Sequence, residues 1–144
     1  MPSQATHVAD VNLLDVARTA ARAAAQVVRE RAADLPSLEW TAKSPTDFVS
    51  AVDLAAEERI RDVVGRLLPG AVVAGEELTP DAVSGEGVVF VADPLDGTTN
   101  FLHGLPHHCI SIALRREAEV VAAVNLDPTH DRLFTATRGG GAFL

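Results

Sequence analysis

The sequence contains a single cysteine, Cys109, among its 144 residues. One cysteine cannot form a disulfide within the chain, and it excludes a zinc site built from several cysteines. Such sparing use of cysteine is typical of proteins in a reducing compartment. We therefore expect a cytoplasmic protein.

Basic residues are also few. Lys and Arg number 12 against 20 Asp and Glu, for a formal net charge of −8, and no run of Lys or Arg occurs. Proteins that bind nucleic-acid polymers obtain most of their affinity from clustered cations, so this class of partner is not expected. A small anionic substrate is still compatible with the acidic charge, because a divalent cation between protein and substrate reverses the local field.

Long apolar runs are missing from the sequence as well. No stretch approaches the ~20 residues that cross a membrane, so no membrane span is expected. Residues 1–15 have neither a basic segment nor an uninterrupted apolar one, so no signal peptide is expected. What the sequence does have is 47% apolar residues, enough for one core. We expect one domain over residues 1–144.

Apolar residues at three- and four-residue steps predict two amphipathic helices. The first covers residues 10–33, and the second runs over about 53–68, where Pro69-Gly70 provides a stop. The breakers and small polar residues of 41–47 predict a loop between them. Asp53 would then lie at the amino terminus of the second helix, where a helix N-cap is its simplest structural role.

Short apolar runs after Gly70 predict strands. They cover residues 71–74, 88–92, 109–114, 120–126 and 133–137. The last three are joined by turn-length segments, too short for the crossover that parallel neighbours require, so an antiparallel meander is expected. Together these elements predict an α+β fold in which two long helices pack on one face of a largely antiparallel sheet.

The strongest chemical signal is the segment Val-Ala-Asp-Pro-Leu-Asp-Gly-Thr-Thr-Asn-Phe at 91–101. Asp93 and Asp96 offer two carboxylates, and Mg²⁺ prefers such hard oxygen ligands together with waters and substrate phosphate. The Leu95 carbonyl is a further candidate ligand, and the N–H groups of Gly97 and Thr98 are suited to a phosphate oxygen. An ordinary β-turn with Asx capping is the structural alternative. The combination of carboxylates, proline, glycine and paired threonines in this order favours the functional interpretation.

This segment resembles the first signature of the inositol monophosphatase family, within the lithium-sensitive, magnesium-dependent phosphatase superfamily. Gly75-Glu76-Glu77, the string Lys-Ser-Pro-Thr-Asp at 43–47 and Ala-Val-Asp at 51–53 are similar to further family blocks. Residues 139–143 look like the glycine-containing turn of the family. The resemblance covers nearly all of the chain. It implies the first half of the sugar-phosphatase αβαβα fold, with residues 1–144 as an amino-terminal metal-binding domain.

The resemblance also implies a metal and substrate site. The Mg²⁺ ligands would be Glu76, Asp93, the Leu95 carbonyl and Asp96. The substrate-binding residues would be Glu76, Leu95, Asp96, Gly97 and Thr98. Without the family, Glu76 beside Glu77 would be a solvated acidic pair at a strand end.

Two further roles follow from the resemblance. Thr98 and Asp53 would form the catalytic pair that orients and deprotonates the attacking water, and Lys43 would lie in a loop that helps to close the site. The activity implied is magnesium-dependent hydrolysis of a phosphate monoester of a polyol or sugar. The alternative is a non-catalytic metal- or phosphate-binding remnant, and the intact pair of Asp53 and Thr98 favours the enzyme.

Family members also have a carboxyl-terminal half with a Trp-Asp-x-x-Ala-Gly block whose aspartate completes the second metal site. This block does not occur in the present sequence. We therefore expect full activity to need such a half, and the sheet face and edge that it would cover to be apolar and exposed. The expected partners are a small phosphorylated substrate and either a second copy in a homodimer or a carboxyl-terminal half.

Overall fold

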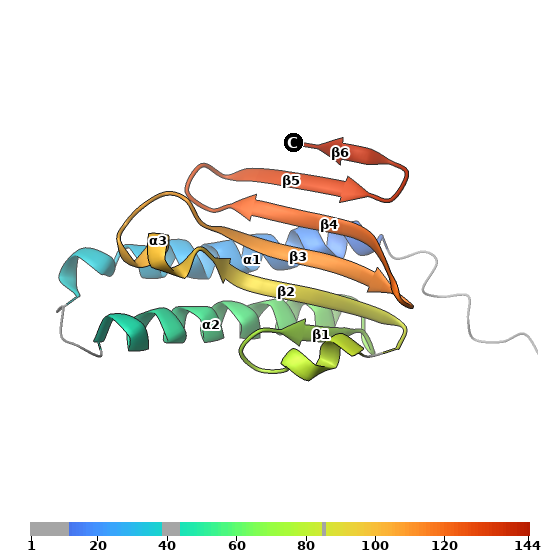
Figure 1. The fold of residues 1–144 in the computed structure, drawn as a ribbon, viewed down its shortest axis with the longest axis horizontal. Helices are drawn as coiled ribbons and strands as arrows, with labels where there is room; N and C mark the ends of the chain where they lie inside the picture. Colours follow the sequence, from blue (N-terminus) through green and yellow to red (C-terminus); the bar gives the residue numbers. More distant parts are fainter. Residues whose placement is uncertain (1–11, 39–43, 85) are drawn as a thin grey trace, which may run out of the picture.

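The computed structural model describes residues 12–38, 44–84 and 86–144. Two long helices lie side by side along a six-stranded sheet whose strands follow one another in chain order (Figure 1). The elements are α1 (Leu13–Ala32), η2 (Leu35–Ser37), α2 (Ser44–Leu67), β1 (Val72–Gly75), η3 (Pro80–Ser84), β2 (Val88–Asp96), α3 (Thr98–Leu102), β3 (Cys109–Arg116), β4 (Glu119–Asp127), β5 (Arg132–Thr137) and β6 (Gly141–Phe143). The predicted α+β class is confirmed.

Helix α1 begins after Asn12, whose side chain accepts a hydrogen bond from the Leu14 amide at 3.1 Å. Its buried face consists largely of alanines, which let it approach α2 and strands β3 and β4 closely. At the other end, Arg29 donates to the Pro128 carbonyl at 2.6 Å and to Asp131 at 2.8 Å. The prediction of a helix over 10–33 is confirmed for the part of it that the structure describes.

Helix α2 begins at Ser44, so the predicted start near Asp53 was wrong. Pro45 was taken as a loop residue, but proline is tolerated in the first turn of a helix because the N–H groups there have no intrahelical partner. Asp53 therefore lies inside the helix, where it cannot serve as the N-cap. Lys43, predicted to lie in a loop that helps to close the site, is outside the described residues.

The sheet is antiparallel except for its first pair. β1 runs parallel to β2, with Gly75 opposite Ala92, and the remaining neighbours form the expected meander. Phe90, Ile112 and Val124 are among the sheet side chains in the core under the two helices. β6, at the position expected to be only a turn, pairs with β5 through Thr135 and Phe143.

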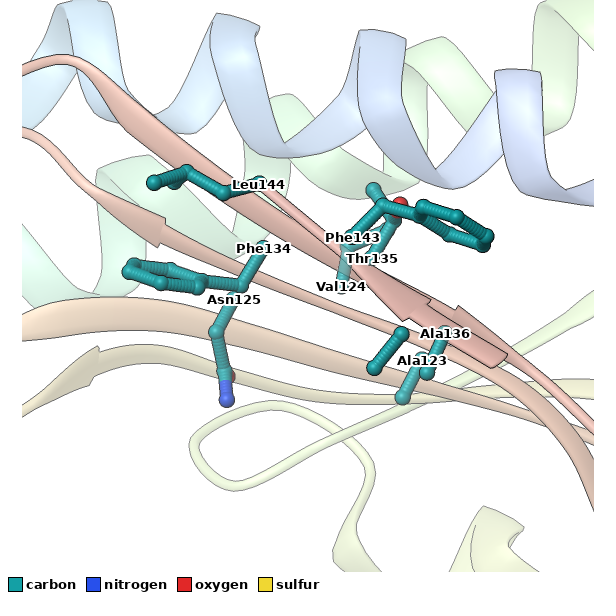
Figure 2. Close-up of a pocket in the computed structure, with 9 residues that line it drawn as sticks. Ala123, Val124, Asn125, Phe134, Thr135, Ala136, Phe143 and Leu144 are labelled. Atoms are coloured by element: carbon teal, nitrogen blue, oxygen red, sulfur yellow. The ribbon is translucent and has the colours of Figure 1, made fainter.

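The β5–β6 edge of the sheet is apolar and exposed, as expected. Phe134, Phe143 and Leu144 keep 45%, 65% and 78% of their surface. These side chains line a pocket of about 350 Å³, and Figure 2 shows its lining residues. Asn125 and Ala136 also line this pocket. No titratable side chain is among its lining residues, so it has the character of a packing surface more than of a reaction site. Within the described ranges, neither long helix is apolar enough to cross a bilayer.

Candidate active site

The parallel pair β1 and β2 brings Glu76 and Asp93 to the same edge of the sheet. Gly75 on β1 pairs with Ala92 on β2, so Glu76 follows at the end of one strand and Asp93 follows at the same level of the other. Burial and then the charge of Glu76 raise the pKa of Asp93, which shows that the two carboxylates interact. Two of the predicted metal ligands, from segments far apart in the sequence, therefore belong to one acidic region.

A cavity of about 340 Å³ lies between this edge, α2 and α3. Among the residues predicted for the site, it is lined by Asp53, Glu76 and Thr98. Asp93, Leu95 and Asp96 are not among the lining residues, which instead include Glu77 and residues of the first turns of α2. The two members of the predicted catalytic pair thus face the same space.

Asp53 is buried in α2, with 6% of its surface exposed. Burial, followed by the negative charges of Glu77 and Asp93 and more weakly of Glu76 and Glu57, raises the pKa of Asp53 to about 7. A carboxylate whose pKa lies near neutral pH is suited to accept a proton in a reaction. The contribution of the neighbouring carboxylates to this shift corresponds to a negative potential in the cavity, which favours a cation there.

The last part of strand β2 contains an irregularity that carries the other predicted ligands. The register with β3 shifts between Asp93 and Asp96, and Asp93 Oδ1 accepts a hydrogen bond from the Leu95 amide at 3.3 Å. This contact is the Asx feature of the structural alternative, and it also orients the Asp93 carboxylate. The Leu95 side chain is buried in the core with 2% exposure, so only its backbone groups can serve the site.

Asp96 is exposed at the end of β2, and the Cys109 thiol lies 3.9 Å from its Oδ2. Burial, and then the charges of Asp96 and Asp93, raise the pKa of Cys109 to about 11. The thiol therefore stays protonated at neutral pH and is a poor nucleophile.

Both the backbone conformation at position 97 and the atoms around it require a glycine. Its φ is +93°, and a Cβ atom there would lie 2.8 Å from the His107 carbonyl oxygen. Gly97 is the N-cap residue of α3, in the left-handed conformation, so Thr98 is the first residue of that helix. The His107 carbonyl accepts a hydrogen bond from the Asn100 side chain at 2.8 Å, which holds the turn in place.

One residue that contacts the backbone beside the site was not predicted from the sequence. Glu57 is completely buried, and its carboxylate accepts hydrogen bonds from the backbone amides of Glu77 and Leu78. Its position four residues after Asp53 was the available signal, because residues at this spacing share one face of a helix.

The donor chemistry of the acidic region fits Mg²⁺. Carboxylates and a backbone carbonyl are hard oxygen ligands, and the neighbouring carboxylates, which together with burial raise the pKa values of Asp53 and Asp93, produce a field that attracts a cation. Among the described residues, no three His, Cys, Asp or Glu side chains stand close enough together to hold a metal ion as they are. The ligand set of Glu76, Asp93, Leu95 and Asp96 therefore stays a proposal.

Relatives match this chain over most of its length. An inositol-1-monophosphatase from Rhizobium meliloti is 45% identical over 77% of this chain and 42% of its own. The Nus factor SuhB of Pseudomonas aeruginosa is 40% identical over 92% of this chain and 49% of its own. The crystal structure of the extragenic suppressor protein suhB from Bartonella henselae superposes with a TM-score of 0.75 and 37% identity, over 91% of this chain and 51% of that one.

The present chain thus spans about half the length of the relatives that it matches. The sequence profile of the inositol monophosphatase family matches residues 10–144, which include every residue of the candidate site. On the fold, the cavity and these matches, the chain belongs to the inositol monophosphatase family.

Proposed function

We propose that this chain is the amino-terminal part of a magnesium-dependent phosphatase that hydrolyses phosphate monoesters of polyols or sugars. The observation that carries the proposal is the buried Asp53, whose pKa is raised to about 7, facing the same cavity as Thr98 and Glu76. Family membership supports phosphatase chemistry, and the Rhizobium meliloti relative is named as an inositol-1-monophosphatase.

In this proposal Asp53 accepts the proton of the attacking water, and Thr98 orients that water between the two side chains. A base with a pKa near the working pH combines availability with proton affinity. The backbone N–H groups of Gly97 and Thr98 bind the phosphate, because the first N–H groups of a helical turn have no partner within it. The remaining substrate contacts fall to Glu76, the Leu95 carbonyl and Asp96.

Mg²⁺, held by Glu76, Asp93, Asp96 and the Leu95 carbonyl, would supply positive charge against the phosphate and lower the pKa of water near it. The carboxylates around the cavity, whose charges contribute to the raised pKa of Asp53, disfavour a phosphate by itself. The proposed activity therefore depends on a divalent cation.

The apolar β5–β6 edge supports the further proposal that this chain works together with a carboxyl-terminal half. Because the chain spans about half the length of its relatives, we assign the exposed Phe134 and Phe143 to contacts with a carboxyl-terminal half. That half would also complete the substrate site. A cytoplasmic location is part of the same proposal and is based on the single cysteine.

A non-catalytic role is the alternative, and the relatives named as Nus factors are the reason to keep it. Such a protein could retain metal or phosphate binding. It would have no need of Asp53 and Thr98 together, which both face the cavity here.

The test is phosphate release with Mg²⁺ from inositol phosphate, sugar phosphates and nucleoside phosphates. The assay compares this chain alone with this chain joined to the carboxyl-terminal half of the Rhizobium meliloti relative. We expect release by the joined protein and a loss of at least about 100-fold in Asp53→Asn, since a positioned general base typically contributes 10²–10⁴-fold. If the joined protein is folded and binds Mg²⁺ but releases no phosphate, the binding role is the correct one.

A further inference from the structure

We propose that Glu57 is a positioning residue, which holds the backbone after β1 so that Glu76 faces the cavity. This inference rests on the proposed function, because it assigns Glu57 to the placement of a metal ligand. Glu57 itself does not line the cavity; it acts through the loop that follows Gly75, the last residue of β1.

Both oxygens of the Glu57 carboxylate are used on this loop. Oε2 accepts a hydrogen bond from the Glu77 amide at 2.8 Å, and Oε1 accepts one from the Leu78 amide at 3.0 Å. Two consecutive amides bound by one carboxylate fix both the position and the direction of the backbone. The residue immediately before this clamp is Glu76, so its placement follows from the clamp.

The complete burial of Glu57 indicates that its hydrogen bonds to the loop are a fixed part of the folded structure. A fully buried carboxylate is unfavourable unless hydrogen bonds and a counter-charge compensate for the lost water. The amides supply the hydrogen bonds, and Arg61, one turn further along α2, places its Nε 3.6 Å from Oε1. The two amides and the Arg61 guanidinium therefore together compensate for the water that the Glu57 carboxylate loses on burial.

Arg61 also joins the two ends of the loop. Its Nη2 donates to the Val73 carbonyl at 3.3 Å and to the Thr79 hydroxyl, which in turn donates to the Val73 carbonyl at 2.8 Å. Val73 belongs to β1, and Thr79 follows the loop. The backbone between them is thus held at its middle by Glu57 and at its ends by Arg61.

Gly75 gives an independent indication of the same arrangement. A Cβ atom at this position would lie 2.0 Å from Glu57 Oε1 and 2.1 Å from its Cδ. The conformation of Gly75 is open to other residues, so the requirement is one of space: the Glu57 carboxylate lies directly against the strand. No side chain at position 75 could coexist with the clamp as it stands.

Direct electrostatic action on Asp53 is the weaker explanation for Glu57. Of the four carboxylates that raise the pKa of Asp53, Glu57 contributes least and Glu77 contributes most. The chief effect of Glu57 is therefore on the backbone that carries its acidic neighbours.

The test uses Mn²⁺ as a probe for the divalent site, with affinity measured by calorimetry on the chain as it exists. Glu57→Gln keeps the shape but replaces one acceptor oxygen with an NH₂ group, which cannot accept from an amide. We expect Mn²⁺ affinity to fall by about 10-fold or more, the usual effect of losing a group that orients metal ligands. Glu58→Gln, an exposed neighbour on the same helix, should leave the affinity unchanged and is the matched control.

A second measurement uses the unchanged protein, so it remains informative even if Glu57→Gln fails to fold. Hydrogen exchange in the unchanged chain should show the Glu77 and Leu78 amides protected to the level of β1 amides. Exchange as fast as in an open loop would overturn the proposal, as would a folded Glu57→Gln protein with unaltered Mn²⁺ affinity. Absence of any Mn²⁺ binding by the unchanged chain would instead overturn the proposed function, and the role of Glu57 in it.

Discussion

Phe48 in α2 stacks on Phe101 in α3, with ring centroids 6.4 Å apart and ring planes within 8° of parallel. His108, next to β3, contacts the same Phe101 ring edge-on at 5.3 Å. The stack joins the helix that contains Asp53 to the turn that contains Thr98. It is therefore one of the contacts between the two elements that carry the predicted catalytic side chains.

Loss of this stack should therefore weaken both the fold and the site. Phe101 has 1% of its surface exposed, so Phe101→Ala should lower the free energy of unfolding by about 3–5 kcal/mol. Phe48 is only half-buried, and Phe48→Ala should cost about 1–2 kcal/mol. Urea denaturation measures both. The control is Leu54→Ala, at a side chain that is 39% exposed on the same helix, and it should cost less than either.

The raised pKa of Asp53 predicts a pH-dependent stability. Its pKa is about 7 in the folded protein against 3.8 ordinarily, so between these values the folded state holds a proton that the unfolded state has released. The free energy of unfolding should therefore fall as pH rises from about 4 to about 7.

Asp53→Asn removes this penalty. At pH 8, without divalent cations, the variant should be more stable than the unchanged protein by up to about 4 kcal/mol, the full value of the shift. The gain should shrink as the pH is lowered toward 4. Urea denaturation at several pH values measures the difference, and a gain that does not vary with pH would contradict this origin.

The same carboxylate should couple cation binding to proton release. A cation in the acidic cavity stabilises the ionised form of Asp53, so binding at pH 7 should release protons, and affinity should rise between pH 6 and 8. Calorimetry with Mn²⁺ in two buffers of different ionisation enthalpy measures the number of protons. In Asp53→Asn most of this release should disappear; an unchanged release would assign the protons to another group.

Gly97 offers a test of the turn that begins α3. Gly97→Ala places a Cβ atom 2.8 Å from the His107 carbonyl oxygen, in addition to the strain of a positive φ. Gly70→Ala is a matched control, because its φ is +90° and nothing lies within 4 Å of the added atom.

The control should therefore report the cost of the backbone conformation alone, about 1 kcal/mol. Gly97→Ala should cost about 1–3 kcal/mol more, as overpacking does, and should weaken the binding of inorganic phosphate in the presence of Mn²⁺. Urea denaturation and a phosphate titration measure the two effects. Equal losses of stability in the two variants would show that the His107 contact is unimportant.

Local pattern in the sequence was sufficient to predict much of this protein. The helical spacing in α1, the apolar run of β3 and the short turns around β4 act over a few residues, and the structure confirms each of them. The segment that contains Asp93, Asp96 and Gly97 was also predicted as the functional centre, because its residue types carry their chemistry wherever the chain places them. Its ligand roles remain a proposal.

Other features depended on residues that are distant in the sequence. Pro45 looked like a breaker and proved to lie in the first turn of α2, and β6 became a strand only because β5 offered a partner edge. Helical spacing placed Glu57 on the same face as Asp53 but did not show that it is buried, since a carboxylate is favourable in a core only when hydrogen-bond donors such as the distant Glu77 and Leu78 amides meet it. Sequence periodicity decided which segments formed helices and strands, because that depends on neighbours along the chain. Packing between segments decided how Asp53, Glu76 and Thr98 share one cavity, because burial and charge compensation arise only when those segments come together.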